Sequence, residues 1–313
     1  MLISSLSSRK LAGKIGLDKE IYCKGLFLSA RWFVVSQSAL EGTHLIILPD
    51  KESAEYCASD LYSLVEGDIV FFLPDNGKRV EKSNYKSTLG VQRTSAIGKI
   101  LSNPDNTDRL FIVSYPEALE ESIPKTSEIE RSVLRLKRGD EVSYDEIKES
   151  LAGQEFEKVD FVSAPGQYSI RGSIIDIFSY SFNDPFRISF FGNEVEKINV
   201  FDCNTQLSKE EKTEVEIFPD LSSSEGDSGE QSIVSIFPVG TTVWFDTFDL
   251  YDKRSFIGEL SSFNKVFLQV PLGKSAEDAI AFNIAPQPVF NKNFEILTSD
   301  IRKNIEYGYK VFI

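Results

Sequence analysis

Apolar residues along the first part of the chain alternate between short continuous runs and stripes with helical spacing. The run HLIILPD at 44–50 is typical of a parallel strand buried on both faces. After it, apolar residues three or four positions apart predict a helix that Asp50 caps at its start and Gly67 at its end. That stripe consists of Ala54, Cys57, Ala58, Leu61 and Leu64. The segment 68–75 predicts another strand and 109–123 repeats the order of strand and helix, so we predict a parallel α/β sheet.

The pattern changes near residue 130. Ser143 and Glu146 form a capping-box signature, which predicts a helix over 144–153. Residues 161–202 consist mostly of strand-like runs separated by turn residues such as Pro, Gly and Asn. The middle of the chain therefore predicts a small α+β domain that is inserted into the α/β pattern.

Residues 219–232 are rich in Ser, Gly and acidic side chains, which is typical of a loop or linker. The α/β pattern then returns, and we expect helices within 272–284 and 299–308. The last residues, YKVFI at 309–313, predict a buried strand, whereas a natural terminus is usually polar and frayed. We therefore expect the sequence to be a fragment of a longer protein.

The composition is that of a globular protein with an acidic surface. The 313 residues are 41% hydrophobic and 26% charged, enough for about two domains. The formal net charge is -14, and such a surface repels phosphate groups, which disfavours general binding to nucleic acid. A local basic patch on this chain would instead attract an acidic partner protein.

Cysteine and histidine usage excludes several classes of site. Cys23, Cys57 and Cys203 are widely spaced without a CxxC pair, so we expect neither a disulfide framework nor a zinc site, and a cytoplasmic location fits. No apolar run reaches the roughly 20 residues of a membrane span, so no membrane partner is expected. His44 is the only histidine and begins an apolar run, which favours a structural role over a catalytic one.

The segment KGLFLSARWFVVSQ at 24–37 occupies the place of a first phosphate loop. A functional loop, GxxxxGK[ST], cradles phosphates with backbone N–H groups and neutralises them with its Lys. Here Gly25 is followed by Ser29, Ala30 and Arg31, and the second glycine and the Lys-Ser/Thr pair are missing. The sequence LGKS further along is rejected as a phosphate loop, because leucine stands where its first glycine would be.

The segment VWFDTFD at 243–249 resembles a strand that ends in the acidic pair of motor ATPases, which holds Mg²⁺ and activates water. Asp246 is followed by Thr247, so the general-base carboxylate is absent. We predict a vestigial RecA/P-loop-like parallel α/β domain without catalytic residue, metal or cofactor. An α/β domain that never bound nucleotide remains the alternative. The degenerate nucleotide site consists of Gly25, Ser29, Arg31 and Asp246.

The strongest signal lies at 161–208, which fits the pattern PGxYxxRGxIxDIF…PxRIxFFGxEVExIxxFDxxTQxS. This pattern resembles the nucleotide-excision-repair helicase UvrB and the UvrB-like N-terminal module of the bacterial transcription-repair coupling factor. UvrB has an intact phosphate loop, whereas this chain has Ser-Ala-Arg at 29–31. The resemblance therefore favours the coupling factor. Leu207 stands where UvrB usually has Arg, a minor departure.

The resemblance implies a discontinuous α/β domain at 1–128 and 211–313, with an inserted UvrB-like domain at 129–210 that binds UvrA. It implies a non-catalytic module that recruits UvrA to RNA polymerase stalled at a DNA lesion. The ATP- and Mg²⁺-dependent motor and the contacts with RNA polymerase and DNA are expected in other parts of the full-length protein. The resemblance also implies that a C-terminal regulatory domain covers the UvrA-binding surface in an autoinhibited state.

The UvrA-binding residues implied by the resemblance are Arg171 in the RG motif, Arg187 in the PxRI motif, and Phe191. The run PFRISFFGNEVEKI at 185–198 reads as a hairpin that turns at Gly192 and Asn193. With a three-residue loop, Ile188 would face Ile198 and Phe186 would face Val200 on the buried side. The other side would carry Arg187, Ser189, Phe191, Lys197 and Asn199, with Val195 beside Phe191. Aromatic and arginine side chains on an exposed face are typical binding anchors.

Other interpretations stay open. Phe191 could be covered by a neighbouring loop, and the two arginines could pair with Glu194 or Glu196. As a whole, the chain could be a UvrB-like ATPase or helicase domain with an unconventional phosphate site. It could also be a DNA-binding module, which the acidic net charge disfavours.

Overall fold

The computed structural model describes residues 6–66, 69–75, 84–154, 156–221, 230–284 and 291–308. The chain divides into two compact units, Met1–Phe282 and Asn283–Ile313. The helices of the first unit are α1 (Leu6–Lys14), α2 (Ala30–Ser38), α3 (Lys51–Leu64), α4 (Asn84–Leu101), α5 (Pro116–Leu119), α6 (Thr126–Ser132) and α7 (Tyr144–Gly153). Four short 3-10 helices follow at Ile233–Ile236, Phe248–Leu250, Ser255–Ile257 and Glu259–Ser262. The second unit carries α8 (Phe294–Glu306), which the side chain of Asn293 caps.

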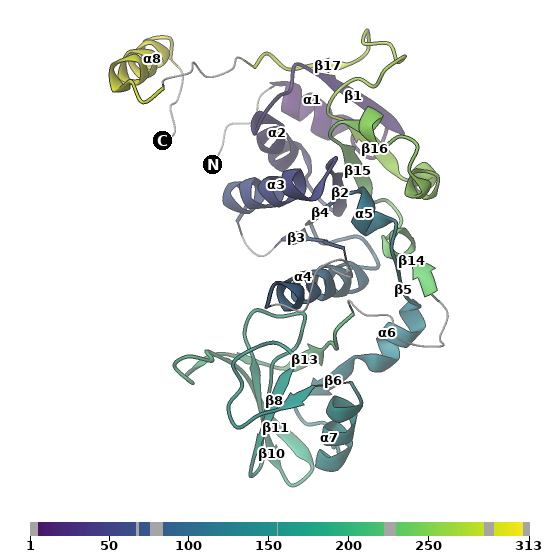
Figure 1. The fold of residues 1–313 in the computed structure, drawn as a ribbon, viewed down its shortest axis with the longest axis vertical. Helices are drawn as coiled ribbons and strands as arrows, with labels where there is room; N and C mark the ends of the chain where they lie inside the picture. The colour runs from purple at the N-terminus through teal and green to yellow at the C-terminus, as the bar shows by residue number, and fades with distance from the viewer. Residues whose placement is uncertain are drawn as a thin grey trace. The chain divides into compact units, whose positions relative to one another are not determined.

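A seven-stranded sheet with parallel pairing organises the first unit (Figure 1). Its order is β17-β1-β16-β15-β2-β4-β3. The strands are β1 (Glu20–Lys24), β2 (Thr43–Ile47), β3 (Val70–Phe72), β4 (Leu110–Ser114), β15 (Thr242–Phe245), β16 (Asn264–Phe267) and β17 (Ile280–Ala281). Strands β2 and β4 are buried throughout, as their continuous apolar sequences require. The predicted parallel α/β architecture is confirmed.

Helix α3 shows how the local sequence sets an element. Asp50 caps it, because its carboxylate accepts a hydrogen bond of 2.8 Å from the backbone N–H of Ser53. Ala54, Cys57 and Leu61 of the predicted stripe are fully buried. The predicted C-terminal cap lies at a residue outside the described ranges.

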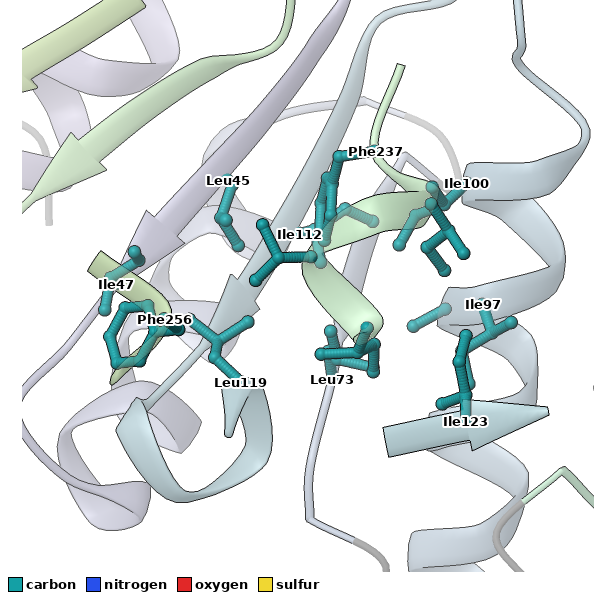
Figure 2. Close-up of a cluster of buried hydrophobic side chains, with 14 of the residues drawn as sticks. Leu45, Ile47, Leu73, Ile97, Ile100, Ile112, Leu119, Ile123, Phe237 and Phe256 are labelled. Carbon is teal, nitrogen blue, oxygen red and sulfur yellow. The ribbon is translucent and has the colours of Figure 1, made fainter. Parts of the chain in front are cut away.

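One large hydrophobic cluster of the α/β part lies on one side of the parallel sheet. Figure 2 shows Leu45 and Ile112 from the central strands facing Ile97 and Ile100 from α4. Phe237, from the second stretch of the α/β chain, packs into the same cluster. Residues on both sides of the inserted segment in the sequence therefore share one core, which explains why the α/β domain can be interrupted without being divided.

The inserted segment forms a separate six-stranded sheet with the order β12-β11-β10-β9-β8-β7. Its strands are β7 (Glu157–Lys158), β8 (Gln167–Arg171), β9 (Ile174–Ile177), β10 (Phe186–Phe191), β11 (Glu194–Phe201) and β12 (Ser208–Lys212). A parallel β7–β8 pair joins four antiparallel pairs. Helix α7 covers one face with Ile147 and Leu151 (Figure 1). The expected small α+β domain is thus present.

Two short two-stranded sheets connect the inserted segment with the rest. Strand β6 (Leu134–Lys137) pairs with β13 (Glu214–Ile217), and β5 (Ser122–Pro124) pairs with β14 (Glu230–Ser232). Each pair joins the chain that enters the insertion to the chain that leaves it. Leu136, Val215 and Ile217 belong to the core under the six-stranded sheet.

Some local predictions fail. Helix α7 begins after Ser143 as predicted, but the serine side chain makes no capping hydrogen bond. The segment 272–284 contains turns and β17 instead of a helix, because Ile280 and Ala281 complete the sheet beside β1. The predicted helix at 299–308 is confirmed within α8. Residues 222–229 of the predicted 219–232 loop, and the predicted strand at 309–313, lie outside the described residues.

His44 sits inside the parallel sheet and not at a site. Its side chain is 1% exposed, and its Nδ1 accepts a hydrogen bond of 3.2 Å from Nε1 of Trp244. The ring also stacks on Phe111. Burial, with a smaller contribution from the charge of Arg109, lowers the pKa of His44 from 6.5 to about 3. The structural role expected for this histidine fits these contacts.

We predict that acid destabilises the chain through His44. In the unfolded chain His44 is protonated below about pH 6.5, whereas in the folded chain it stays neutral down to about pH 3. The free energy of unfolding therefore falls as the pH falls. Between pH 7 and 5 the free energy of unfolding should fall by about 2 kcal/mol. Urea denaturation at each pH measures this loss. His44→Phe, which keeps a ring on Phe111, should remove most of it, and an unchanged pH slope in that variant would contradict the assignment.

Candidate functional site

The β10–β11 hairpin forms with most of the predicted register. Phe186 lies opposite Val200 and Ile188 opposite Ile198. The pairing then shifts between Ser189 and Phe190, so the turn has two residues instead of the expected three. Gly192 allows it with a φ of 63° in the left-handed region.

The shift at Ser189 corrects one part of the prediction. Val195 lies opposite Phe190 and is fully buried in the core, so it does not lie beside Phe191. Phe191 is 79% exposed, and no loop covers it among the described residues. The interpretation of Phe191 as a covered side chain is therefore wrong.

The sheet face opposite α7, which we call the outer face, carries a polar row across four strands. Ser169 lies opposite Asp176, Asp176 opposite Arg187, and Arg187 opposite Asn199. Their inward neighbours along each strand, such as Ile175 and Ile188, pack in the core. The strict two-residue period of a strand forces the polar side chains onto the other face.

Asp176 is the centre of this row. Its side chain is 1% exposed and accepts hydrogen bonds from Nε and Nη2 of Arg187, at 2.7 and 2.9 Å. Arg171 forms a second ion pair with the same carboxylate and donates a third hydrogen bond to it. The alternative in which the arginines pair with Glu194 or Glu196 is wrong, because both of them select Asp176. A buried carboxylate is tolerated only when it is paired in this way.

Arg187 is enclosed by its own domain. Its side chain is 20% exposed, its guanidinium lies 4.3 Å from the ring centre of Phe201, and it also donates to the backbone oxygen and Oε1 of Gln206, at 3.2 and 3.0 Å. The hydrogen bond to Asp176 raises the pKa of Arg187, which keeps this side chain charged. The expectation that Arg187 is exposed is therefore wrong.

Arg171 differs from Arg187 in its surroundings. Its side chain is 39% exposed, and within the described residues its only ion pair is the one to Asp176. The ring of Phe161 lies 5.1 Å from its guanidinium and is itself 64% exposed. The outer face thus presents one accessible arginine with an aromatic ring against it.

The outer face is less cationic than the sequence predicts. The guanidinium groups of Arg171 and Arg187 contribute two positive charges, and the carboxylate of Asp176 removes one of them. Lys197 is paired with Glu211 at 3.2 Å. Attraction of an acidic partner therefore depends on local geometry more than on a strong positive field.

Two residues of the predicted degenerate nucleotide site form an ion pair with each other. Arg31, in the first turn of α2, reaches Asp246 at the carboxyl end of β15. Both side chains are largely buried. Burial raises the pKa of Asp246, while the charge of Arg31 opposes that shift. The carboxyl edge of a parallel sheet is the usual ligand position, and here a guanidinium occupies the place beside the acid.

Gly25 and Ser29 do not complete a phosphate cradle. Gly25 has a φ of 78°, and a Cβ there would collide with the backbone oxygen of Phe282. The glycine therefore serves the close approach of the chain around β17, where the N–H of Phe282 donates to Lys24. Ser29 precedes α2 and its side chain makes no capping hydrogen bond. Of the predicted nucleotide-site residues, Arg31 and Asp246 contact each other, whereas Gly25 packs against the backbone of Phe282.

Comparisons with known proteins agree with this architecture. Residues 134–222 match the family described as the UvrB interaction domain. The transcription-repair-coupling factor of Bacillus subtilis is 31% identical over 204 residues, which are 64% of this chain and 17% of that protein. Those of Haemophilus influenzae and Mycobacterium bovis are 25% and 29% identical over 56% and 58% of this chain, and 15% of each protein.

The chain resembles the UvrB-like N-terminal module of the transcription-repair-coupling factors. The resemblance predicted from the sequence is thus confirmed. The chain spans only 15–17% of the length of these three relatives. In the part that the structure describes, no helix is long and apolar enough to cross a membrane, and no cluster of three His, Cys, Asp or Glu side chains could hold a metal ion.

Sequence reasoning missed two residues of the outer face. Asp176 lies within residues 134–222, which match the UvrB interaction domain. Aligning the alternating residues of β9 and β10 as an antiparallel pair would have placed Asp176 opposite Arg187. Phe161 gives no such signal, because it lies outside the regular strands in a segment without periodicity. Its contact with Arg171 becomes visible only in three dimensions.

We predict that Arg187 stabilises the fold. Arg187→Ala leaves buried Asp176 with one partner and uncovers Phe201, so the free energy of unfolding should fall by about 2–4 kcal/mol. The matched control is Arg135→Ala, which removes a surface pair with Glu216 (2.8 Å) and should cost no more than about 1 kcal/mol. Urea denaturation of the two variants measures the difference. Equal losses would show that the Asp176 carboxylate does not need Arg187.

Proposed function

We propose that this chain is a non-catalytic module that recruits UvrA to RNA polymerase stalled at a DNA lesion, in transcription-coupled nucleotide excision repair. The observation that carries the proposal is the outer face, where exposed Phe191 and partly exposed Arg171 lie within a match to the UvrB interaction domain. Exposed aromatic and arginine side chains are the groups that most often dominate binding energy.

The geometry brings the two side chains within reach of one partner. Arg171 lies opposite Ile174, and Ile174 lies opposite Ser189 on β10. Phe191 follows two residues along the same strand and so points to the same face. A partner with a carboxylate beside an apolar side chain would satisfy both, because a guanidinium fork suits a carboxylate and a benzyl ring suits an apolar surface.

The remaining activities belong to other parts of the longer protein. We propose that the ATP-dependent DNA translocase and the contacts with RNA polymerase lie C-terminal to residue 313. In this proposal a C-terminal regulatory domain covers the outer face until the motor engages. A cytoplasmic location fits, and the free thiols of Cys23, Cys57 and Cys203 are consistent with a reducing compartment.

The competing function, a UvrB-like ATPase, is disfavoured by the Arg31–Asp246 pair. An intact site would present Asp246 to Mg²⁺ and a Lys to the phosphates. Here the carboxylate is already neutralised by Arg31, and Gly25 is held against Phe282. Opening the site would require breaking a largely buried ion pair, which is costly.

We predict that the chain does not bind ATP. Equilibrium dialysis with labelled ATP and Mg²⁺ should show no saturable binding at micromolar nucleotide, because Asp246, the candidate Mg²⁺ ligand, is already paired with Arg31 and the phosphate-binding Lys is missing. An intact P-loop ATPase measured alongside provides the positive control. Saturable binding that Arg31→Ala alters would revive the ATPase interpretation.

We predict that Phe191→Ala and Arg171→Ala each weaken UvrA binding by about 1–3 kcal/mol, the range of interface hot spots. Arg187→Ala should weaken binding as well. Phe191→Ala should leave the melting temperature nearly unchanged, since its ring is exposed. The measurement is isothermal titration of the purified chain with UvrA, backed by thermal melts.

Two variants are the matched controls for this titration. Arg135→Ala removes a surface arginine of β6, and Tyr56→Ala removes an exposed aromatic ring of α3, in the α/β domain. Both should bind UvrA like the parent chain. If Phe191→Ala and Arg171→Ala also bind like the parent, the outer face is not the UvrA site.

A further inference from the structure

We propose that the outer face divides its work between two sets of side chains. Phe161 and Arg171 form a contacting pair, whereas Arg187 and Asp176 are positioning residues that hold Arg171 in place. This inference rests on the proposed UvrA-binding function and goes beyond it. It adds Phe161 to the residues that contact UvrA, and it makes Arg187 a residue that positions Arg171 instead of contacting UvrA.

The hydrogen bonds of Arg187 leave little for a partner. A guanidinium has five N–H donors, and four hydrogen bonds of Arg187 already go to Asp176 and Gln206. One face of its plane lies against the ring of Phe201. A bidentate contact needs two parallel N–H groups. Arg187 could offer them only by releasing the buried carboxylate or Gln206.

Arg171 has the opposite balance. Arg171 donates one hydrogen bond to Asp176, and its other N–H groups have no partner among the described residues. With 39% of its side chain exposed, it can turn a free edge outward while Asp176 holds the inner edge. A carboxylate on the partner can therefore pair with Arg171 without dismantling the domain.

Phe161 completes the contacting pair. Its ring lies 5.1 Å from the guanidinium of Arg171, yet 64% of the residue is exposed. The backbone around it is fixed, because Ser169 Oγ donates to the oxygen of Asp160 (2.8 Å) and the N–H of Val159 donates to Tyr168 (2.9 Å). Because the backbone beside Phe161 is already ordered, binding needs to order only the side chain, which favours a hot spot.

Asp176 acts only through the arginines. At 1% exposure it is out of reach of a partner, and its carboxylate joins Arg187 on one side to Arg171 on the other. The partner chemistry that fits is an acidic side chain next to an apolar one, with the carboxylate on Arg171 and the apolar group on Phe161. This is the same chemistry for which Phe191 provides a second apolar contact.

The first test is Phe161→Ala in titrations with UvrA. We expect binding about tenfold weaker, with an unchanged melting temperature, because an exposed hot-spot ring is removed. Tyr56→Ala is the matched control for loss of an exposed aromatic ring. Unchanged binding by Phe161→Ala, while Arg171→Ala and Phe191→Ala lose affinity, would overturn this inference and leave the proposed function intact. Unchanged binding by all three would overturn the proposed function itself.

The second test separates positioning from contact by a double-mutant cycle. Arg187→Ala should weaken binding in the parent chain, but in the Arg171→Ala background the further loss should stay within about twofold, since the two losses share one cause. The titrations are made well below the melting temperature of every variant. Losses that multiply in full would show that Arg187 contacts UvrA by itself.

Arg187→Lys keeps the test informative if Arg187→Ala folds poorly. Lysine retains a charge against Asp176 but cannot form a bidentate fork. The lysine therefore holds Asp176 less firmly, and a positioning role predicts that any loss of binding it causes in the parent chain stays within about twofold in the Arg171→Ala background. A loss that persists in full in the Arg171→Ala background would assign a direct contact to Arg187 and contradict the inference.

Discussion

Burial of the Asp176 carboxylate on the outer face is the constraint on which the proposed binding surface depends. A carboxylate that is 1% exposed must be paired, and the cross-strand register offers Arg187 directly opposite it. Arg187 is committed to this pairing, and among the described residues Arg171 donates only one hydrogen bond, to the same carboxylate. The accessible chemistry of the sheet therefore follows from an acid that no partner touches.

A second arginine–aspartate pair, Arg31 with Asp246, lies in the α/β domain and has a different effect. Arg31 pairs with Asp246 at the carboxyl end of β15, the sheet edge at which parallel α/β proteins usually bind ligands. In the inserted domain the pair Arg187–Asp176 holds a surface in place instead of filling a site. The two pairs support one account in which the α/β domain provides a scaffold and the insertion provides recognition.

The sequence predicted the elements whose periodicity is strong. The buried runs of β2 and β4, the stripe and cap of α3, and the pairing of Ile188 with Ile198 follow from alternation and capping chemistry. The shift after Ser189, which turns Val195 inward, depends on turn geometry that a run of letters does not encode. Predicting that Arg171 and Arg187 both pair with Asp176 would have required the register of three strands, β8, β9 and β10. Predicting the contact between Phe161 and Arg171 would have required the folded structure.

The most direct measurement of the central claim is a crystal or cryo-electron microscopy structure of this chain bound to UvrA. The account predicts that Arg187 keeps its hydrogen bonds to Asp176 and Gln206 in the complex, while an acidic side chain of UvrA lies on Arg171 and apolar atoms cover Phe161 and Phe191. A complex in which Arg187 has left Asp176 to hold a UvrA carboxylate, or in which UvrA sits elsewhere on the chain, would contradict it.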